Sequence, residues 1–202
     1  MERQGLQLLH HGMHPVIVTR SGVSIDLRDS EYPAPTLEDI FWGLAHRYRY
    51  SCQTDPTFNL GHHCLFVKKA LDVIYKDSTL SLAGLLHDAG EAILWDVPAP
   101  VKPYVYFENT PWEEVEHKIT YALFQSLGIP NHLLTDASLV EIDMLSRVLE
   151  SERIPTSSIY YKTPKPRQNA LIEEYGLRDL FQETYLIREN PIDTFEKLKS
   201  SI

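Results

Sequence analysis

The chain has 202 residues, 43% of them hydrophobic, and a formal net charge of −9 at pH 7. This length suffices for one substantial core, whereas a second independent domain would be unusually small. The acidic total leaves no basic surface able to neutralise a run of phosphates, which argues against duplex nucleic acid as a partner. Cys52 and Cys64 are too few for a disulfide framework, so we expect free thiols in a reducing compartment.

The N-terminal residues show no basic segment followed by an apolar run of signal-peptide length, and no stretch of roughly 18 apolar residues occurs. We therefore expect a cytoplasmic protein without a membrane partner. Residues 16–28 alternate apolar and polar side chains around a Ser-Gly pair, which predicts a short hairpin or an extended arm. We assign residues 1–34 to an N-terminal arm, 35–190 to a helical domain and 191–202 to a C-terminal tail.

Apolar residues at helical spacing, with caps and turn formers between them, predict a series of helices. The expected ranges are roughly 36–48, 62–75, 80–94, 110–128 and 136–154. The third is apolar on nearly every side, which is typical of a helix at the centre of a bundle. A loop with three prolines follows it, and a Thr cap opens the fourth. After a polar loop, one or two weaker helices complete an all-α fold.

The third predicted helix contains a pair of polar residues that needs an explanation. His87 and Asp88 are adjacent there, and Glu91 follows within one turn. An ionised Asp in an apolar helix is costly unless it is paired or binds a cation. His63, preferred over His62, and Asp143 are suitable further ligands on neighbouring helices. Two His and two Asp suit Mn²⁺, Co²⁺, Fe²⁺, Ni²⁺ or Zn²⁺, with Mg²⁺ as a further candidate.

Three segments carry a resemblance to a known family. The residues run His63, then His87-Asp88, then Asp143, and the segment LLHDAGEAILWDVPAPVK is similar to a block HDASE…D(L/V)P.P(V/L)K. The chain thus resembles HD-domain phosphohydrolases, most closely the YfbR-like 5′-deoxynucleotidases, over roughly residues 20–155. The resemblance implies an HD-domain helical bundle. The chain departs from the pattern at Gly90, where Ser is commoner, which bears on the substrate more than on the metal.

Two flanking segments resemble phage and prophage members in particular. Arg49-Tyr50 stands about fourteen residues before His63, and EIDMLSRVLESE resembles a block in which a ligand Asp is followed seven residues later by Glu. Asp143 and Glu150 occupy those places and share a helix face. If the chain is phage-encoded, its compartment is the host cytoplasm.

The metal site and the resemblance together imply a phosphohydrolase that converts a deoxynucleoside 5′-monophosphate to nucleoside and phosphate. Glu91, with Asp96 ranked second, would orient the attacking water or accept its proton. Arg49 would bind phosphate bidentately, and Lys102 would add a mobile positive charge. Side chains that could stack on a nucleobase are Trp42, Tyr50, Phe58 and Trp95.

Two rival functions stay open on the sequence alone. Small phage proteins that the chain resembles include triphosphohydrolases of deoxynucleoside triphosphates such as dATP. A non-catalytic nucleotide sensor would keep the pocket without the reaction, although the intact ligand set and Glu91 argue against it. The resemblance also implies a homo-oligomer.

Overall fold

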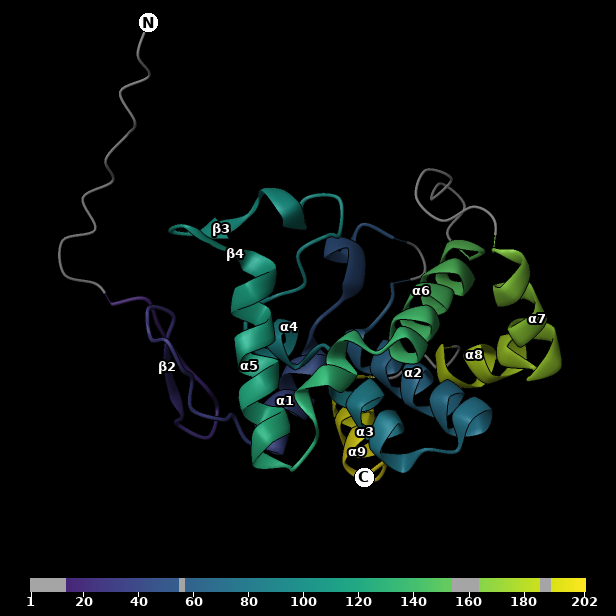
Figure 1. Cartoon of the computed structure of the whole chain (residues 1–202), viewed down its shortest axis with the longest axis horizontal. Coiled ribbons are helices and arrows are strands. Elements are labelled where there is room, and N and C mark those ends of the chain that lie inside the picture. Colours follow the sequence, from purple (N-terminus) through teal and green to yellow (C-terminus); the bar gives the residue numbers. More distant parts are fainter. Residues whose placement is uncertain (1–13, 55–56, 154–163, 186–189) are drawn as a thin grey trace, which may run out of the picture.

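The computed structural model describes residues 14–54, 57–153, 164–185 and 190–202 (Figure 1). Helices dominate these residues, so the expected all-α class is confirmed. The α-helices are α1 (Leu37–His46), α2 (Leu60–Tyr75), α3 (Ser78–Leu86), α4 (Ala89–Ile93), α5 (Trp112–Ser126), α6 (Ala137–Ser151), α7 (Pro166–Glu174), α8 (Leu177–Tyr185) and α9 (Pro191–Lys199).

The strands form two short antiparallel hairpins. β1 (Val16–Val18) pairs with β2 (Ser24–Asp26), so of the two alternatives expected at residues 16–28 the hairpin is confirmed. β3 (Tyr106–Phe107) pairs with β4 (Thr110–Pro111), which directly precedes α5 in the sequence. Residues 1–13 of the expected N-terminal arm and most of the polar loop, 154–163, lie outside the described residues.

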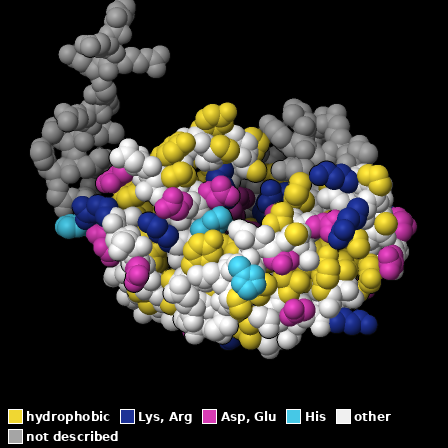
Figure 2. All heavy atoms as spheres, in the orientation of Figure 1, with side chains coloured by type: hydrophobic (Ala, Val, Ile, Leu, Met, Phe, Trp, Pro, Cys, Tyr) yellow, Lys and Arg dark blue, Asp and Glu magenta, His cyan; other side chains and the backbone are white. Residues whose placement is uncertain are grey.

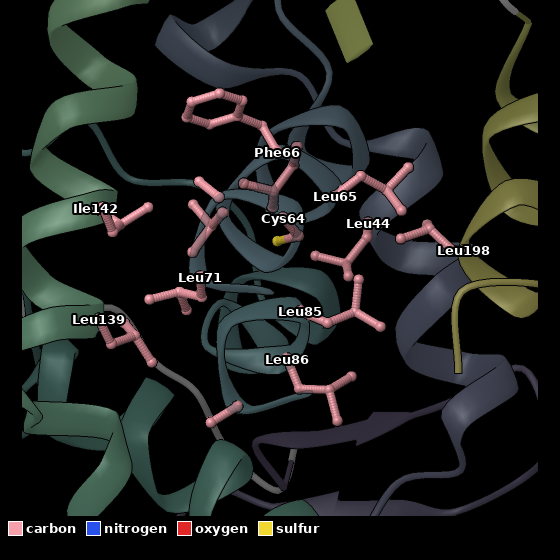
Figure 3. Close-up of a cluster of buried hydrophobic side chains, with 14 of the residues drawn as sticks. Leu44, Cys64, Leu65, Phe66, Leu71, Leu85, Leu86, Leu139, Ile142 and Leu198 are labelled. Carbon is pink, nitrogen blue, oxygen red and sulfur yellow. The ribbon is translucent and has the colours of Figure 1, made fainter. Parts of the chain in front are cut away.

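Helix α2 lies at the centre of the core. The Asn59 side chain caps it by accepting hydrogen bonds from the backbone N–H groups of Gly61 and His62, and its amide donates to the carbonyl of Ala45 at the end of α1. Helices α1, α3, α6, α8 and α9 all pack against α2. Figure 3 shows apolar side chains of α2 and α3 meeting those of α6 and α9 in this core. The core around α2 is therefore mainly apolar.

The prediction of a single helix at residues 80–94 was wrong, because the helical conformation is interrupted between α3 and α4. Asp88, with φ −94° and ψ 23°, leaves the helical conformation, and each short helix packs on different neighbours. Helix α3 packs on α2, whereas α4 lies between α1 and α5 (Figure 1). At Gly90 the approach to α5 is so close that an added Cβ would lie 2.3 Å from the backbone oxygen of Glu116. Apolar residues continue on both sides of the break, so periodicity cannot reveal it.

Two other expectations about helices need correction. The fourth helix does not begin with a Thr cap: Thr110 pairs in β4, and α5 starts at Trp112 after Pro111. The predicted end of this helix is confirmed: Gly128, with φ +70°, comes directly after the final turn of α5. The described C-terminal residues form three short helices, α7 to α9, rather than one or two, and each supplies only a few apolar positions.

The expected C-terminal tail forms α9, which packs on α1 and α2. Leu198 of α9 is fully buried, and Thr194 lies 3.2 Å from the ring of His62. The domain boundaries stay a prediction.

A second apolar cluster joins the β1–β2 hairpin to α5. Ile25 of β2 is buried against Val115 and Ile119 of α5, together with Trp112. Within the described part of the chain, no helix is long and apolar enough to cross a membrane.

Candidate metal centre

Four side chains from three parts of the chain converge where α2, α6 and the α3–α4 break meet. The Nε2 atom of His63 lies 3.2 Å from Nε2 of His87, 3.2 Å from Oδ1 of Asp143 and 3.5 Å from Oδ2 of Asp88. The Nε2 atom of His87 lies 3.3 Å from Asp88 and 3.8 Å from Asp143. The structure thus brings together all four residues that the sequence analysis selected as ligands.

The spacing of these atoms fits a metal ion. Metal–ligand distances of about 2.0–2.2 Å place the donors of a tetrahedral site about 3.3–3.6 Å apart, close to the separations observed here. His63, His87 and Asp143 are all buried, and each offers a donor atom within 4.8 Å of the others. This group could hold a metal ion.

Hydrogen bonds on the far side of each imidazole hold it in place. Nδ1 of His87 lies 2.8 Å from the carbonyl oxygen of Gly84, so it donates there and leaves Nε2 to face the centre. Nδ1 of His63 lies 3.0 Å from the hydroxyl of Ser146 and 3.5 Å from Glu150.

The carboxylates of the centre are held in the charged form. Burial alone would raise the pKa of Asp143, but hydrogen bonds from His63 and His87 and the charge of Arg147 lower it well below its usual value. Burial likewise raises the pKa of Asp88, but the nearby imidazoles of His87 and His63 outweigh this effect. The pKa of Asp88 is therefore lower than its usual value. Ionised carboxylates are the form in which Asp binds a cation.

A buried carboxylate, Glu150, organises the edge of the centre. It accepts hydrogen bonds from Nε of Arg49 at 3.2 Å, from the hydroxyl of Tyr50 at 2.5 Å and from the hydroxyl of Tyr185 at 2.6 Å. The guanidinium of Arg49 is itself buried and also lies 3.8 Å from Asp88. Sequence reasoning noted Glu150 but assigned it no role, and it missed Tyr185, which lies on a weakly predicted helix.

Lys102 bridges two buried glutamates beside the centre. Its Nζ atom donates to Oε1 of Glu91 at 2.5 Å and lies 2.8 Å from Oε2 of Glu116. Burial raises the pKa of Glu91 well above its usual value and that of Glu116 to about 7, and Lys102 opposes both shifts. Sequence reasoning missed Glu116, although a charged residue beside Val115 in the apolar stripe of α5 was a usable signal.

Cys64 approaches the centre without being a suitable ligand. Its sulfur lies within 4.8 Å of donor atoms of His87 and Asp88. Burial raises the pKa of the thiol to about 11. Because the thiolate is the form that binds metals, Cys64 serves here as a small core residue.

Two hollows open at the centre, and Figure 2 shows acidic and basic side chains gathered around a recess in this face. The larger, about 450 Å³, is lined by Arg49, Tyr50, Asp96 and the proline-containing loop 97–103. The smaller, about 150 Å³, lies against α5 and α6. The residues that line both are Asp88, Glu91, Lys102, Glu113 and Arg147.

Three of the aromatic residues expected near the substrate lie elsewhere, and one of them, Phe58, is buried in the core. Trp42 stacks on His46, with Arg20 over its ring, and Trp95 stacks on Trp112. Neither tryptophan lines either hollow. Tyr50 is the expected aromatic residue that does.

No family model matches the chain. A curated protein of Rhodobacter capsulatus is 31% identical to it over 140 residues, which cover 66% of this chain and 70% of that protein. That protein is described as uncharacterized, so the comparison gives no activity and the function has to be argued from the chemistry of the site.

Proposed function

We propose that this chain, which belongs to the same family as the uncharacterized Rhodobacter capsulatus protein, is a divalent-metal-dependent phosphohydrolase of the HD-domain type that acts on nucleotides. The observation that carries the proposal is the convergence of His63, His87, Asp88 and Asp143 beside the larger hollow, which also contains the buried Arg49. The H…HD…D order of these residues in the sequence supports the same assignment.

The donor set indicates which ions fit. Two imidazoles and two carboxylates suit Mn²⁺, Fe²⁺, Co²⁺, Ni²⁺ or Zn²⁺, whereas Mg²⁺ prefers a shell of oxygen atoms. When bound by these four residues, such an ion would polarise a phosphoryl oxygen and lower the pKa of a water molecule.

Arg49 is the residue best placed to hold the phosphoryl group. Glu150 accepts from its Nε, and Arg49 lines the larger hollow next to Asp88. The two terminal nitrogens can then donate to two phosphoryl oxygens at once, as a guanidinium fork does. Positive charge at this position stabilises the negative charge that develops during transfer.

Glu91 is the proposed acceptor of the proton of the attacking water. Its buried carboxylate lies in the wall between the two hollows and is held there by Lys102. The oxygen of water bonds to phosphorus, the bond from phosphorus to the ester oxygen breaks, and the released alcohol takes up a proton. A carboxyl group whose pKa is raised by burial exchanges protons closer to neutral pH than an exposed one. Asp96, whose pKa burial also raises, is the second candidate.

The larger hollow fits a nucleotide in size and lining. Its volume of about 450 Å³ lies in the range of small-molecule sites, which is about 300–1,000 Å³. Tyr50 and the apolar loop residues can contact a nucleoside, while Arg49 and Asp88 lie at the phosphate end. Because the chain also resembles the YfbR-like 5′-deoxynucleotidases, we propose deoxynucleoside 5′-monophosphates as the first substrate class.

The proposal is tested by product analysis with a panel of deoxynucleoside and ribonucleoside mono- and triphosphates, each with Co²⁺, Mn²⁺, Mg²⁺ or Zn²⁺. The wild type is compared with Asp88→Ala and with Asp179→Ala, a matched change at an exposed position of α8. We expect phosphate release from deoxynucleoside monophosphates by the wild type and Asp179→Ala, and none by Asp88→Ala.

Other outcomes change the assignment in defined ways. Preferred turnover of triphosphates, with release of tripolyphosphate, would replace the nucleotidase with a triphosphohydrolase. Nucleotide binding without turnover in any metal would rule out the enzyme in favour of a sensor.

A further inference from the structure

The two hollows that meet at the candidate metal centre differ in charge. The larger contains three basic side chains (Arg49, Lys102, Arg147) and four acidic ones (Asp88, Glu91, Asp96, Glu113). The smaller contains two basic side chains (Lys102, Arg147) and five acidic ones (Asp88, Glu91, Glu113, Glu116, Asp143). The lining of the larger hollow is nearly balanced in charge and opposes an anionic substrate less, whereas the more acidic lining of the smaller hollow favours a cation.

The candidate ligands are also distributed unequally between the linings of the two hollows. Three of the four, His87, Asp88 and Asp143, line the smaller hollow. Only Asp88 lines the larger one, and His63 is fully buried. An ion that approaches through the smaller hollow therefore meets most of its ligands directly.

Glu116 adds a partly unsatisfied carboxylate to the smaller hollow. It is 4% exposed, and its Oε2 atom pairs with Lys102. Among the described residues, no hydrogen-bond partner reaches its Oε1 atom. Leaving a buried polar oxygen unpaired is costly, and a cation passing through the hollow would satisfy it. Glu116 does not line the larger hollow.

From these observations we infer that the smaller hollow is the route by which a divalent ion reaches and leaves the centre, with Glu116 as a transient ligand. The inference rests on the metal centre of the proposed function. Acidic clefts with low-dielectric walls concentrate cations and speed their association. The substrate would use the larger hollow, so nucleotide and ion would not compete for one opening.

Val140 provides a steric test of the route. It lines the smaller hollow from α6 and is 41% exposed, so Val140→Phe narrows the opening without filling the core. The metal-free protein is mixed with Co²⁺ in a stopped-flow spectrometer, and release is followed after addition of excess chelator. We expect association and release to slow by the same factor, with unchanged affinity, because a narrowed passage affects both directions equally.

Glu116→Gln tests the electrostatic part of the route. At about pH 8 the Glu116 carboxyl, with its pKa of about 7, is mostly ionised, so removing its charge should slow Co²⁺ association about three- to tenfold at low ionic strength, with a smaller effect at high salt. Glu114→Gln is the matched control, since Glu114 lies on the same helix but is exposed and lines neither hollow. Circular dichroism of each variant checks that it is folded.

Ala99→Phe narrows the larger hollow instead and should leave both Co²⁺ rates unchanged. If Ala99→Phe slows Co²⁺ association and release while Val140→Phe does not, the route runs through the larger hollow and the inference is wrong. Equal rates in all variants would also overturn it while leaving the metal centre intact. Failure of the wild type to bind Co²⁺ at equilibrium would instead remove the metal centre, and the proposed function with it.

Discussion

Replacing Gly90 with alanine should weaken the contact between α4 and α5. The added Cβ would lie 2.3 Å from the backbone oxygen of Glu116 and 2.7 Å from its Cα, atoms that cannot rotate away. Overpacking of this kind costs about 1–3 kcal/mol or more, and alanine recovers about 0.5–1 kcal/mol of helix propensity. We expect a net loss of about 2 kcal/mol, which lowers the melting temperature by about 4–8 °C in a chain of this length.

Gly84→Ala is the matched control, because its Cβ would meet the movable end of the Leu71 side chain, at 2.4 Å, rather than backbone. Thermal unfolding followed by circular dichroism and urea titration of the metal-free protein give the two losses in stability. Gly90→Ala should be clearly the more destabilised variant. A Gly90→Ala protein as stable as the wild type, or no worse than Gly84→Ala, would refute the close helix contact as the reason for this glycine.

Three further predictions concern the centre and the N-terminal hairpin. Co²⁺ at a hundredfold excess over its dissociation constant should stabilise the wild type by about 2.7 kcal/mol and leave Asp88→Ala unchanged in a thermal shift assay. Glu150→Ala should cost about 3–5 kcal/mol in urea titration, because it leaves the buried charge of Arg49 without its partner; a loss below about 1 kcal/mol would contradict this. Burial would raise the pKa of Asp39, but hydrogen bonds from Ser21 and Thr36 lower it to about 2. The contribution of the ionised Asp39 carboxylate to the free energy of unfolding is therefore complete above about pH 4 and disappears as the pH falls towards 2. Asp39→Asn should flatten the dependence of unfolding free energy on pH between 5 and 2, and an unchanged slope would exclude this role.

The sequence predicts the members of the centre better than the contacts that support them. A His-Asp pair in an apolar helix is visible because burying an unpaired charge is costly, so His87 and Asp88 stand out. Tyr185 does not, since its role depends on which helices become neighbours, and Glu116 is marked only by its place in the apolar stripe of α5. Spacing along one helix cannot show that Lys102, from a loop, reaches α5.

Helix boundaries were predicted well where a cap or a glycine marks them, as Thr36 and Gly128 do in the structure. The α3–α4 break has no such mark, since its neighbours in sequence are apolar on both sides. The fourth helix shows the opposite error: Thr110 looks like a cap, but it pairs in a strand two residues before α5 begins.

The break at Asp88 has a direct connection to the site. Adjacent residues of an α-helix project about 100° apart, so an uninterrupted helix would turn His87 and Asp88 towards different neighbours. In the structure both lie within 3.5 Å of His63, because the chain leaves the helix at Asp88 and starts α4 in a new direction. Gly90 then allows α4 to approach the backbone of α5, which carries Glu116. The departure from helical geometry is thus what lets two consecutive residues contribute to one centre, and Gly90→Ala should disturb the centre as well as the fold.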